Sequence, residues 1–337
     1  MPLLGCGERR GPPAQKIGIE SFGHLSMRSW QPEDRTLKFA TPGVKDKPMQ
    51  LTNDGIHHFA LGEFTVTALN DGMFEASTGI VDGLPADAVE AQLTANFRPL
   101  PPRITVSAFL LRSPDRTVLI DTGCGGNMGP AMGGVLRRLD RLGVAPEAVD
   151  TVLVTHAHID HISGLLTETG AARFANAELV LHEAEPAFWL NETIAAAAPE
   201  ASQKSFALAR SCLTPYAART RTVTDGASVL PGISALHLPG HTPGHCGWVI
   251  ASGNEKLLVW GDVVHLPGLQ FAQPAAGLVF DVDVELARKT RRRAFDMAAT
   301  DRLRVAGMHL DFPTFGHVIS AGDGFSFVPE VWTPTCG

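Results

Sequence analysis

The sequence predicts an α/β fold whose strands come in two runs, each with its own helices. Strand-like and helix-like segments alternate from residue 64 to residue 182 and again from residue 228 to residue 310. Neither an internal repeat nor a low-complexity linker divides residues 56–331. We therefore expect one domain there, with an extension or arm rich in Pro, Gly and charge at residues 1–55 and a short tail at residues 332–337.

The first run of expected elements leads toward a cluster of histidines. FTVTALNDG (64–72) is typical of a strand that ends in a turn, and VSAFLLRSPDRTVLIDTG (106–123) of two strands joined at Ser-Pro-Asp. In PAMGGVLRRLDRLGV (130–144) the apolar residues recur at the spacing of a helix, and a glycine near the end is expected to terminate it. The strands TVLVT (151–155) and AELVLH (177–182) follow, with the histidines between them.

The second run begins after an alanine-rich stretch, residues 183–222, which looks helical and is expected to cover a pocket. Further strands are expected within SVLPGISALHLPG (228–240), GWVIAS (247–252) and KLLVWGDVV (256–264). A helix over about 283–299 and a last strand in RVAGMHL complete the pattern.

Composition excludes several classes of partner. The net charge of −7 and the pI near 6.0 argue against nucleic acid, because phosphate binding needs concentrated Lys and Arg. The one basic run, residues 288–293, is expected to be a solvated helix face. No apolar run is long enough for a membrane span, and no signal peptide is evident, so we expect no membrane partner. Five scattered cysteines favour a cytoplasmic location, although a misassigned start would leave export open.

The motif H-x-H-x-D-H follows the strand TVLVT directly. It places four possible metal ligands, His156, His158, Asp160 and His161, within six positions. Imidazole nitrogens and carboxylate oxygens suit zinc and neighbouring divalent metals, and strand ends are where α/β folds carry chemistry. The alternative, polar loop residues at a turn, gives such a dense cluster little structural use. The motif therefore predicts a metal site.

Three more strand ends carry residues that would complete such a site. His241 lies in LPGHTPGH, Asp262 in LLVWGDVVH and His309 in VAGMHLDF. Each alone is weak, because a single strand-end histidine is more often a hydrogen-bonded structural residue. The ordered series H-x-H-x-D-H, His, Asp, His is far more specific.

In this ordered series the sequence resembles the metallo-β-lactamase superfamily, and LIDTG around Asp121 extends the resemblance. The resemblance implies an αβ/βα four-layer sandwich. It also implies one ion held by His156, His158 and His241, a second ion held by Asp160, His161 and His309, and Asp262 bridging the two. Asp121 is then expected to orient a ligand, and His245 to support its neighbour His241.

The implied chemistry is hydrolysis by a hydroxide that bridges two divalent ions, most simply zinc, although the ligand set also suits Mn, Co or Fe. Asp160 could also shuttle a proton. Neither a G-x-S-x-G elbow nor a cysteine with a convincing partner suggests a covalent route.

A closer resemblance, over about residues 58–331, is to the methyl parathion hydrolase branch. It rests on the blocks TALNDG, EPAFWL, LVWGDVVHLPGLQFAQP, GMHLDFPTFGHV and GFSFVP. The branch implies a homodimer that acts on organophosphate triesters, aryl esters or lactones in an aromatic, apolar pocket. The expected pocket residues are Met128, Trp189, Phe206, Leu266 and Phe271, with plain core packing as the alternative for each aromatic ring.

Two departures from that branch shift the expected substrate. Asn127-Met128 stands where organophosphate-hydrolysing members carry an apolar pair with an aromatic, and His265 stands where they carry an aliphatic residue. A histidine near the metals could hydrogen-bond a carbonyl substrate or assist the leaving oxygen, unless it merely binds backbone. We therefore expect a hydrolase of lactones or aryl esters with promiscuous triester hydrolysis. The alternatives are a dedicated phosphotriesterase and a non-catalytic metal-binding sensor or scaffold.

Overall fold

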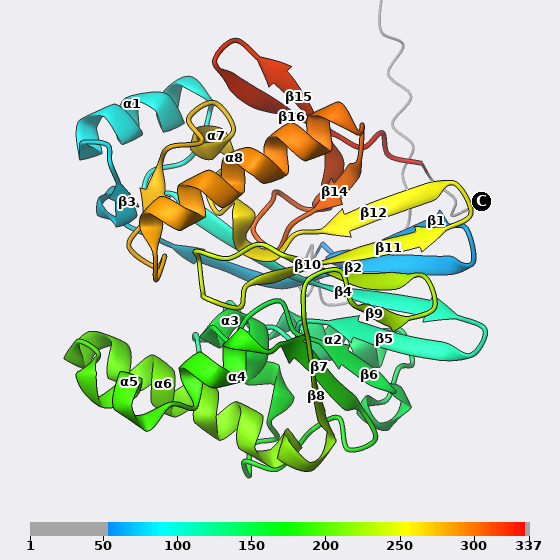
Figure 1. Ribbon diagram of the computed structural model, residues 1–337. Coiled ribbons are helices and arrows are strands. Elements are labelled where there is room, and N and C mark those ends of the chain that lie inside the picture. Colours follow the sequence, from blue (N-terminus) through cyan, green and yellow to red (C-terminus); the bar gives the residue numbers. More distant parts are fainter. Residues whose placement is uncertain (1–52, 334–337) are drawn as a thin grey trace, which may run out of the picture. The chain divides into compact units, whose positions relative to one another are not determined.

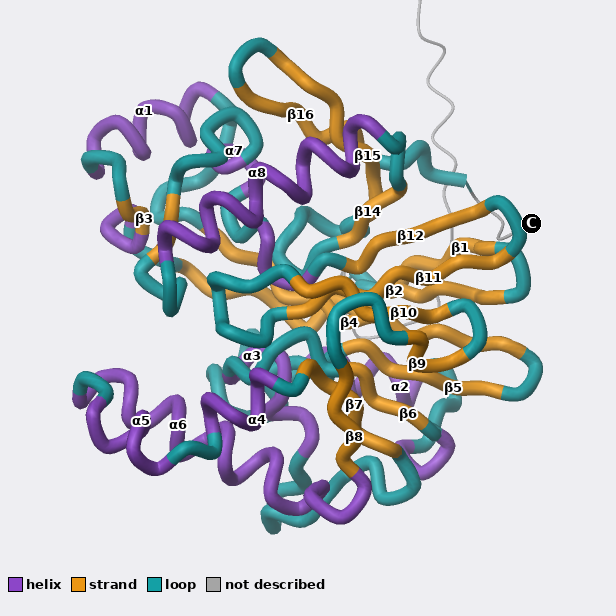
Figure 2. The backbone as a smooth tube through the Cα atoms, viewed as in Figure 1, coloured by secondary structure: helices purple, strands orange, loops and turns teal. Residues whose placement is uncertain are grey.

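The computed structural model describes residues 53–333. The expected extension at residues 1–55 therefore lies almost wholly outside the described residues, as does most of the expected tail. Within the described range, two seven-stranded sheets lie face to face, and helices cover the outer face of each (Figure 1). The tube view shows the strands gathered between two groups of helices (Figure 2). This arrangement is the four-layer αβ/βα sandwich that the resemblance to the metallo-β-lactamase superfamily implies.

The first sheet contains the first run of strands. Its order is β1 (Ile56–Leu61), β2 (Phe64–Glu75), β4 (Arg103–Ser113), β5 (Arg116–Ile120), β6 (Thr151–Leu153), β7 (Glu178–His182) and β8 (Thr220–Val223). The strands from β1 to β5 pair antiparallel, and those from β5 to β8 pair parallel. The parallel half brings the carboxyl ends of β5 and β6 to the same edge of the sheet.

The second sheet contains the second run. Its order is β16 (Gly324–Pro329), β15 (Phe315–Ala321), β14 (Arg304–Ala306), β12 (Glu255–Val259), β11 (Cys246–Ser252), β10 (Ile233–His237) and β9 (Ser228–Leu230). Only β12 and β14 pair parallel, so these two strands also end at one edge. A small separate sheet pairs β3 (Val81–Asp82) with β13 (Gly277–Leu278).

The helices divide between the two outer faces (Figure 1). The first group is α2 (Gly134–Arg141), α3 (Ile159–Ile162), α4 (Ala184–Trp189), α5 (Glu192–Ala197) and α6 (Glu200–Leu213). The second group is α1 (Ala86–Ala95), α7 (Pro267–Gln270) and α8 (Val284–Thr300). Short 3-10 turns are η1 (Thr78–Ile80), η2 (Pro146–Ala148), η3 (Ser163–Leu165), η4 (Thr214–Arg219) and η5 (Gly261–Val263). No helix of the described residues is long and apolar enough to cross a bilayer.

Successive side chains of a strand point to opposite faces of the sheet, so one sheet contributes residues to two cores. In β4, Ala108 and Leu110 pack with the first group of helices, whereas Phe109 and Leu111 pack into the layer between the sheets. A third core lies between the second sheet and α8, where Phe295 is fully buried. Each strand that is apolar on both faces is thereby covered on both faces, which explains the continuous apolar runs in the sequence.

Two local predictions are wrong. The stretch NDG does not end its strand: β2 continues to Glu75, with a register shift between Asn70 and Gly72. The bulge turns Asp71 inward, where its carboxylate accepts backbone N–H groups from the loop and helix after β5. The basic run at residues 288–293 is not entirely a solvated face, because Arg291 is 1% exposed and donates to the carbonyl oxygens of three residues, Val263, Pro274 and Ala276.

Candidate metal centre

The structure brings together all seven residues that the sequence analysis names as metal ligands. They lie just beyond the carboxyl ends of four strands: four come from the loop after β6 and from helix α3, and one each follows β10, β12 and β14. Two groups form. The first group is His156, His158, His241 and Asp262; the second group is Asp160, His161, His309 and Asp262. The ligand atoms within each group lie within 4.8 Å of one another.

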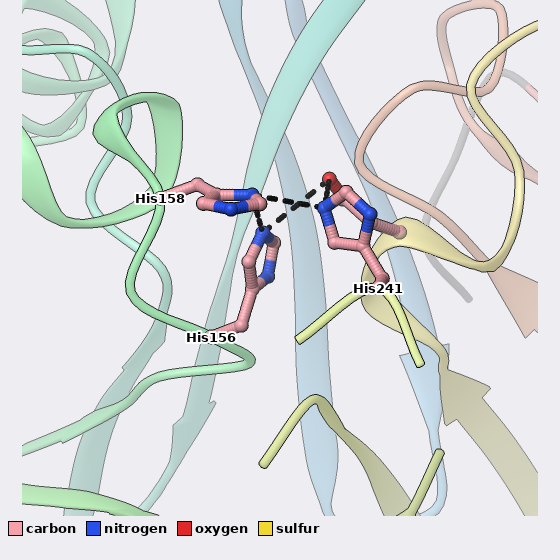
Figure 3. Close-up of side chains that lie close together, drawn as sticks. His156, His158 and His241 are labelled. Atoms are coloured by element: carbon pink, nitrogen blue, oxygen red, sulfur yellow. Dashed lines mark hydrogen bonds and ion pairs between the residues drawn. The ribbon is translucent and has the colours of Figure 1, made fainter. Parts of the chain in front are cut away.

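In the first group three imidazole nitrogens point at one another (Figure 3). His158 Nδ1 is 3.0 Å from His156 Nε2 and 2.9 Å from His241 Nε2. Burial lowers the pKa of His156 and of His158 well below the ordinary value, so both rings are neutral and offer a lone pair. Burial lowers the pKa of His241 too, but Asp262 and Asp281 outweigh it and raise that pKa to about 9, so a metal ion at this nitrogen would displace a proton. Three ring nitrogens at this spacing suit a metal ion better than they suit one another.

The second group mixes carboxylate and imidazole. Asp160 Oδ2 is 3.4 Å from both His161 Nε2 and His309 Nε2. Asp262 Oδ2 lies 3.3 Å from the first of these nitrogens and 3.0 Å from the second. Burial raises the pKa of Asp160, but His161 and His309 outweigh it and hold that pKa below its usual range, so the carboxylate is ionised.

Asp262 belongs to both groups. Its Oδ2 atom is also 3.2 Å from His241 Nε2 and 3.5 Å from His156 Nε2. Its other oxygen, Oδ1, and His161 Nε2 are buried and have no hydrogen-bond partner. Unpartnered buried polar atoms are costly unless something else binds them, and the nitrogen and oxygen donors fit divalent ions of the zinc type. The residues therefore fit a two-metal site.

Side chains of the first sheet orient two of these histidines. Asp121, directly after β5, has a left-handed backbone (φ +58°), and its Oδ2 atom is 2.7 Å from His161 Nδ1. The same carboxylate accepts the N–H and hydroxyl of Thr155, whose Oγ1 is 3.1 Å from His156 Nδ1. This contact fits the orienting role expected for Asp121.

Two further orienting contacts involve a backbone carbonyl of β4 and a carboxylate in the loop before α8. His309 Nδ1 is 2.7 Å from the carbonyl oxygen of Thr105. His241 Nδ1 is 2.8 Å from Asp281 Oδ1, and Arg291 lies 3.8 Å from the other oxygen of that carboxylate. Sequence reasoning missed Asp281, because it lies in an irregular loop before α8 and follows no recognisable motif.

His245 orients a different ligand from the one expected. Its Nδ1 is 2.7 Å from the carbonyl oxygen of Leu238, and its Nε2 accepts the backbone N–H of Asp262 at 2.9 Å. Burial lowers the pKa of His245 to about 3, so the ring is neutral, as this donor-and-acceptor pattern requires. The prediction that it supports His241 is therefore corrected: it fixes the backbone of the shared aspartate.

A cavity of about 990 Å³ opens onto both groups. Of the pocket residues expected from sequence, Met128, Trp189 and Phe206 line it, and so does His265. Sequence reasoning missed most of its apolar wall, which consists of Phe74, Phe188, Ile194, Ala197, Ala198, Val279, Phe280 and Val282. The cavity is thus polar where the ligand groups lie and mainly apolar elsewhere, with Thr193, Ser202 and Ser205 as further polar residues of the lining.

Leu266 and Phe271 are not in this cavity wall. Phe271 is 3% exposed and packs in the third core, with its ring stacked on that of Phe295 at a centroid distance of 4.9 Å. Leu266 is 3% exposed and packs with residues of α1 and α7. The turn at Pro267 directs both side chains away from the metal groups, so both pocket predictions are corrected.

The side chain of His265 faces the metal groups. Its Nε2 is 3.0 Å from Asp262 Oδ2, and its Nδ1 is buried without a hydrogen-bond partner. Burial lowers its pKa to about 4. Its backbone N–H, rather than its ring, makes the structural contact, donating to Gln270 Oε1 at 2.7 Å. The alternative that the ring merely binds backbone does not describe this geometry.

The layered fold and the two ligand groups at its strand ends define a metal-dependent hydrolase class. The family model of the metallo-beta-lactamase superfamily matches residues 101–309, and the chain belongs to that superfamily. An N-acyl homoserine lactonase from Bacillus cereus is 25% identical over 269 residues, 73% of this chain and 93% of the relative. A second, from a Bacillus species, is 27% identical over 198 residues, 58% of this chain and 66% of that relative.

Two solved structures share the fold across most of their length. The hydrolase AbOPH of the beta-lactamase superfamily is 30% identical with a TM-score of 0.80, covering 84% of this chain and all of that one. AidC, a dizinc quorum-quenching lactonase solved with the product N-hexanoyl-L-homoserine, is 26% identical with a TM-score of 0.78. That match covers 83% of this chain and 98% of AidC.

Proposed function

We propose that this protein is a metal-dependent lactonase that opens lactones carrying an apolar substituent and also cleaves aryl esters. The observation that carries the proposal is the cavity, in which both ligand groups and His265 meet an apolar wall. The similarity to N-acyl homoserine lactonases supports the same substrate class. Membership in the methyl parathion hydrolase branch stays a prediction.

The chain's own groups divide the work of hydrolysis. The two groups would hold divalent ions, and those ions would supply the Lewis acidity that polarises a carbonyl and acidifies water. We assign Asp160, whose side chain is 12% exposed and lines the cavity, to relay the proton from the attacking water to the departing ring oxygen. His265 lines the cavity beside Asp262, and its ring N–H faces Asp262 Oδ2 at 3.0 Å. If a bound ion takes that oxygen, the N–H would be available to donate to a substrate oxygen.

The apolar wall selects the rest of the substrate. Phe188, Trp189 and Phe206 pack against one another, with ring centroids 4.8 to 5.1 Å apart, and form one side of the cavity. An apolar chain placed there is removed from water, which contributes about 0.8 kcal/mol per buried CH₂. We therefore expect affinity to rise with the length of the apolar substituent.

A substrate panel on zinc-reconstituted protein tests the proposal. It compares N-acyl homoserine lactones of increasing chain length, dihydrocoumarin, an aryl ester and a paraoxon-like triester. We expect the highest kcat/KM on a lactone, with KM falling as the chain lengthens. A triester rate well above both lactone rates would instead identify a dedicated phosphotriesterase. Metal binding without turnover of any substrate would identify a sensor or scaffold.

A further inference from the structure

Glu185, in α4, is a fully buried carboxylate that the mechanism above does not use. Its Oε2 atom accepts the backbone N–H of Ala157 at 2.7 Å and the indole N–H of Trp189 at 2.9 Å. Its Oε1 atom accepts the backbone N–H of Gly244 at 2.9 Å and the hydroxyl of Thr242. Four donors from three separate segments of the chain therefore converge on one side chain.

The chemistry of these partners favours an ionised carboxylate. Burial raises the pKa of Glu185, and the four hydrogen bonds that it accepts oppose that shift. All four partners donate, and only an ionised carboxylate offers two oxygens that accept without donating. A glutamine at this position would turn its NH₂ group toward two of the donors. At least one N–H group would then be buried without an acceptor, which is the costly way to lose a hydrogen bond.

The partners of Glu185 flank the three histidines of the first group. Ala157 lies between His156 and His158, and Thr242 and Gly244 follow His241. Figure 3 shows these histidines meeting from two separate segments of the chain. Residues of the second group have other supports, because Asp121 contacts His161 and the carbonyl of Thr105 contacts His309.

Trp189 connects the same carboxylate to the substrate cavity. Its ring lies at the cavity wall, 4.8 Å from the ring of Phe206 and 5.4 Å from the ring of His158. Within the described chain, the indole N–H makes a single hydrogen bond, and its acceptor is Glu185. One side chain thus sets both the spacing of the histidine loops and the position of the aromatic wall.

We propose that Glu185 is a positioning residue that couples the first metal group to the apolar wall of the cavity. Metal affinity at His156, His158 and His241 and the fit of an apolar substrate chain then depend on the same carboxylate. The kinetic part rests on the proposed function, whereas the metal-binding part stands without it.

Zinc titration of Glu185→Gln tests the metal-binding part, with competition by a chromophoric chelator as the readout. Two parent variants isolate the groups: His309→Ala leaves the first group complete, and His241→Ala leaves the second. In the first parent, Glu185→Gln should weaken zinc binding roughly tenfold or more, as loss of a ligand-orienting contact does. In the second parent it should leave zinc binding unchanged. Glu183→Gln, an exposed neighbour of the same chemistry, is the matched control.

Equal zinc affinity with and without Glu185→Gln in the first parent would overturn the proposal, and so would equal losses in both parents. If Glu185→Gln does not fold, Thr242→Val and Trp189→Phe replace it as the test. Each substitution removes one hydrogen-bond donor to Glu185 and leaves an apolar side chain of similar shape. Each should weaken zinc binding several-fold in the first parent only. An unchanged affinity in both would refute the coupling.

Kinetics separate this inference from the proposed function. Trp189→Phe should raise KM for a long-chain lactone more than for a short-chain one while kcat changes less. KM values that change equally for both chain lengths would refute the link to the wall. If the parent protein opens no lactone and Glu185→Gln still loses zinc selectively, the proposed function fails and the positioning role stands.

Discussion

Replacing Asp281 by asparagine perturbs the centre without touching a metal ligand. Its Oδ1 atom is 2.8 Å from His241 Nδ1, and its Oδ2 atom accepts the N–H of Leu278 at 3.0 Å. The asparagine amide has one oxygen for these two donors, so its NH₂ group must face either the imidazole or the backbone N–H. Both side chains of the His241 contact are at most 3% exposed, so water does not substitute for the lost acceptor.

The expected cost follows from that geometry. A hydrogen bond to a charged group contributes about 1.5–3 kcal/mol, and leaving a buried donor unpaired costs about 1–3 kcal/mol. Loss of an orienting contact to a ligating histidine weakens metal affinity about 10–100-fold, equivalent to about 1.4–2.7 kcal/mol. The two ranges agree, so we expect zinc affinity of the first group to fall by that factor.

Zinc competition with a chromophoric chelator measures this loss, and circular dichroism checks that the variant is folded. The matched control is Asp115→Asn, at an exposed turn between β4 and β5, which should bind zinc like the parent. A folded Asp281→Asn variant with unchanged zinc affinity would refute the orienting role assigned to Asp281.

Three further predictions concern the cavity and the core. His265→Leu should lower lactone kcat/KM at least tenfold and spare triester hydrolysis, and an equal loss on both substrates would contradict its role toward carbonyl oxygens. Ile194→Glu places a charge in the apolar wall of the cavity. It should raise KM for a long-chain lactone roughly tenfold with little change in kcat. A change confined to kcat would argue against binding of the substrate chain by this wall. Arg291→Met removes the side-chain donor to two buried carbonyl oxygens, those of Val263 and Pro274, whereas the carbonyl of Ala276 keeps the donor Gln270 Nε2. The substitution should lower the free energy of unfolding by about 3 kcal/mol in urea titrations, and a loss below about 1 kcal/mol would show that the carbonyls find other donors.

The ligands were predictable because each follows a recognisable strand. His156, His241, Asp262 and His309 come after apolar segments whose period identifies them as strands, and parallel strands end at a common edge. The two layers of sheet followed from the resemblance to the metallo-β-lactamase superfamily, which agrees with the two runs of strands, each with its own helices.

The residues that orient the ligands were harder to find. Glu185 follows a strand but lies in a polar-looking stretch, HEAEPAFW, where a glutamate is ordinarily a surface helix residue. Asp281 lies in a loop with no periodic signal. Arg291 looks solvated because its neighbours are, although its own position on α8 faces the core. Burial of a charged side chain depends on tertiary partners that a local pattern does not contain.

The errors in the cavity have the same origin. Phe271 was expected in the wall because the resemblance to the methyl parathion hydrolase branch implies an aromatic pocket, yet its ring stacks with that of Phe295 in the third core. The true wall combines α4 to α6 with the loop before α8, segments about 80 residues apart in the sequence. Only the assembled fold places them together.

The central claim, that two metal-binding groups at the strand ends perform hydrolysis, is tested most directly by lactone turnover against metal content. The protein is stripped with a chelator, dialysed and titrated with zinc while bound metal and lactone hydrolysis are both measured. The account predicts that activity is lost on stripping and returns as zinc binds, reaching its maximum at two ions per chain. Full lactone hydrolysis by the stripped protein would contradict it.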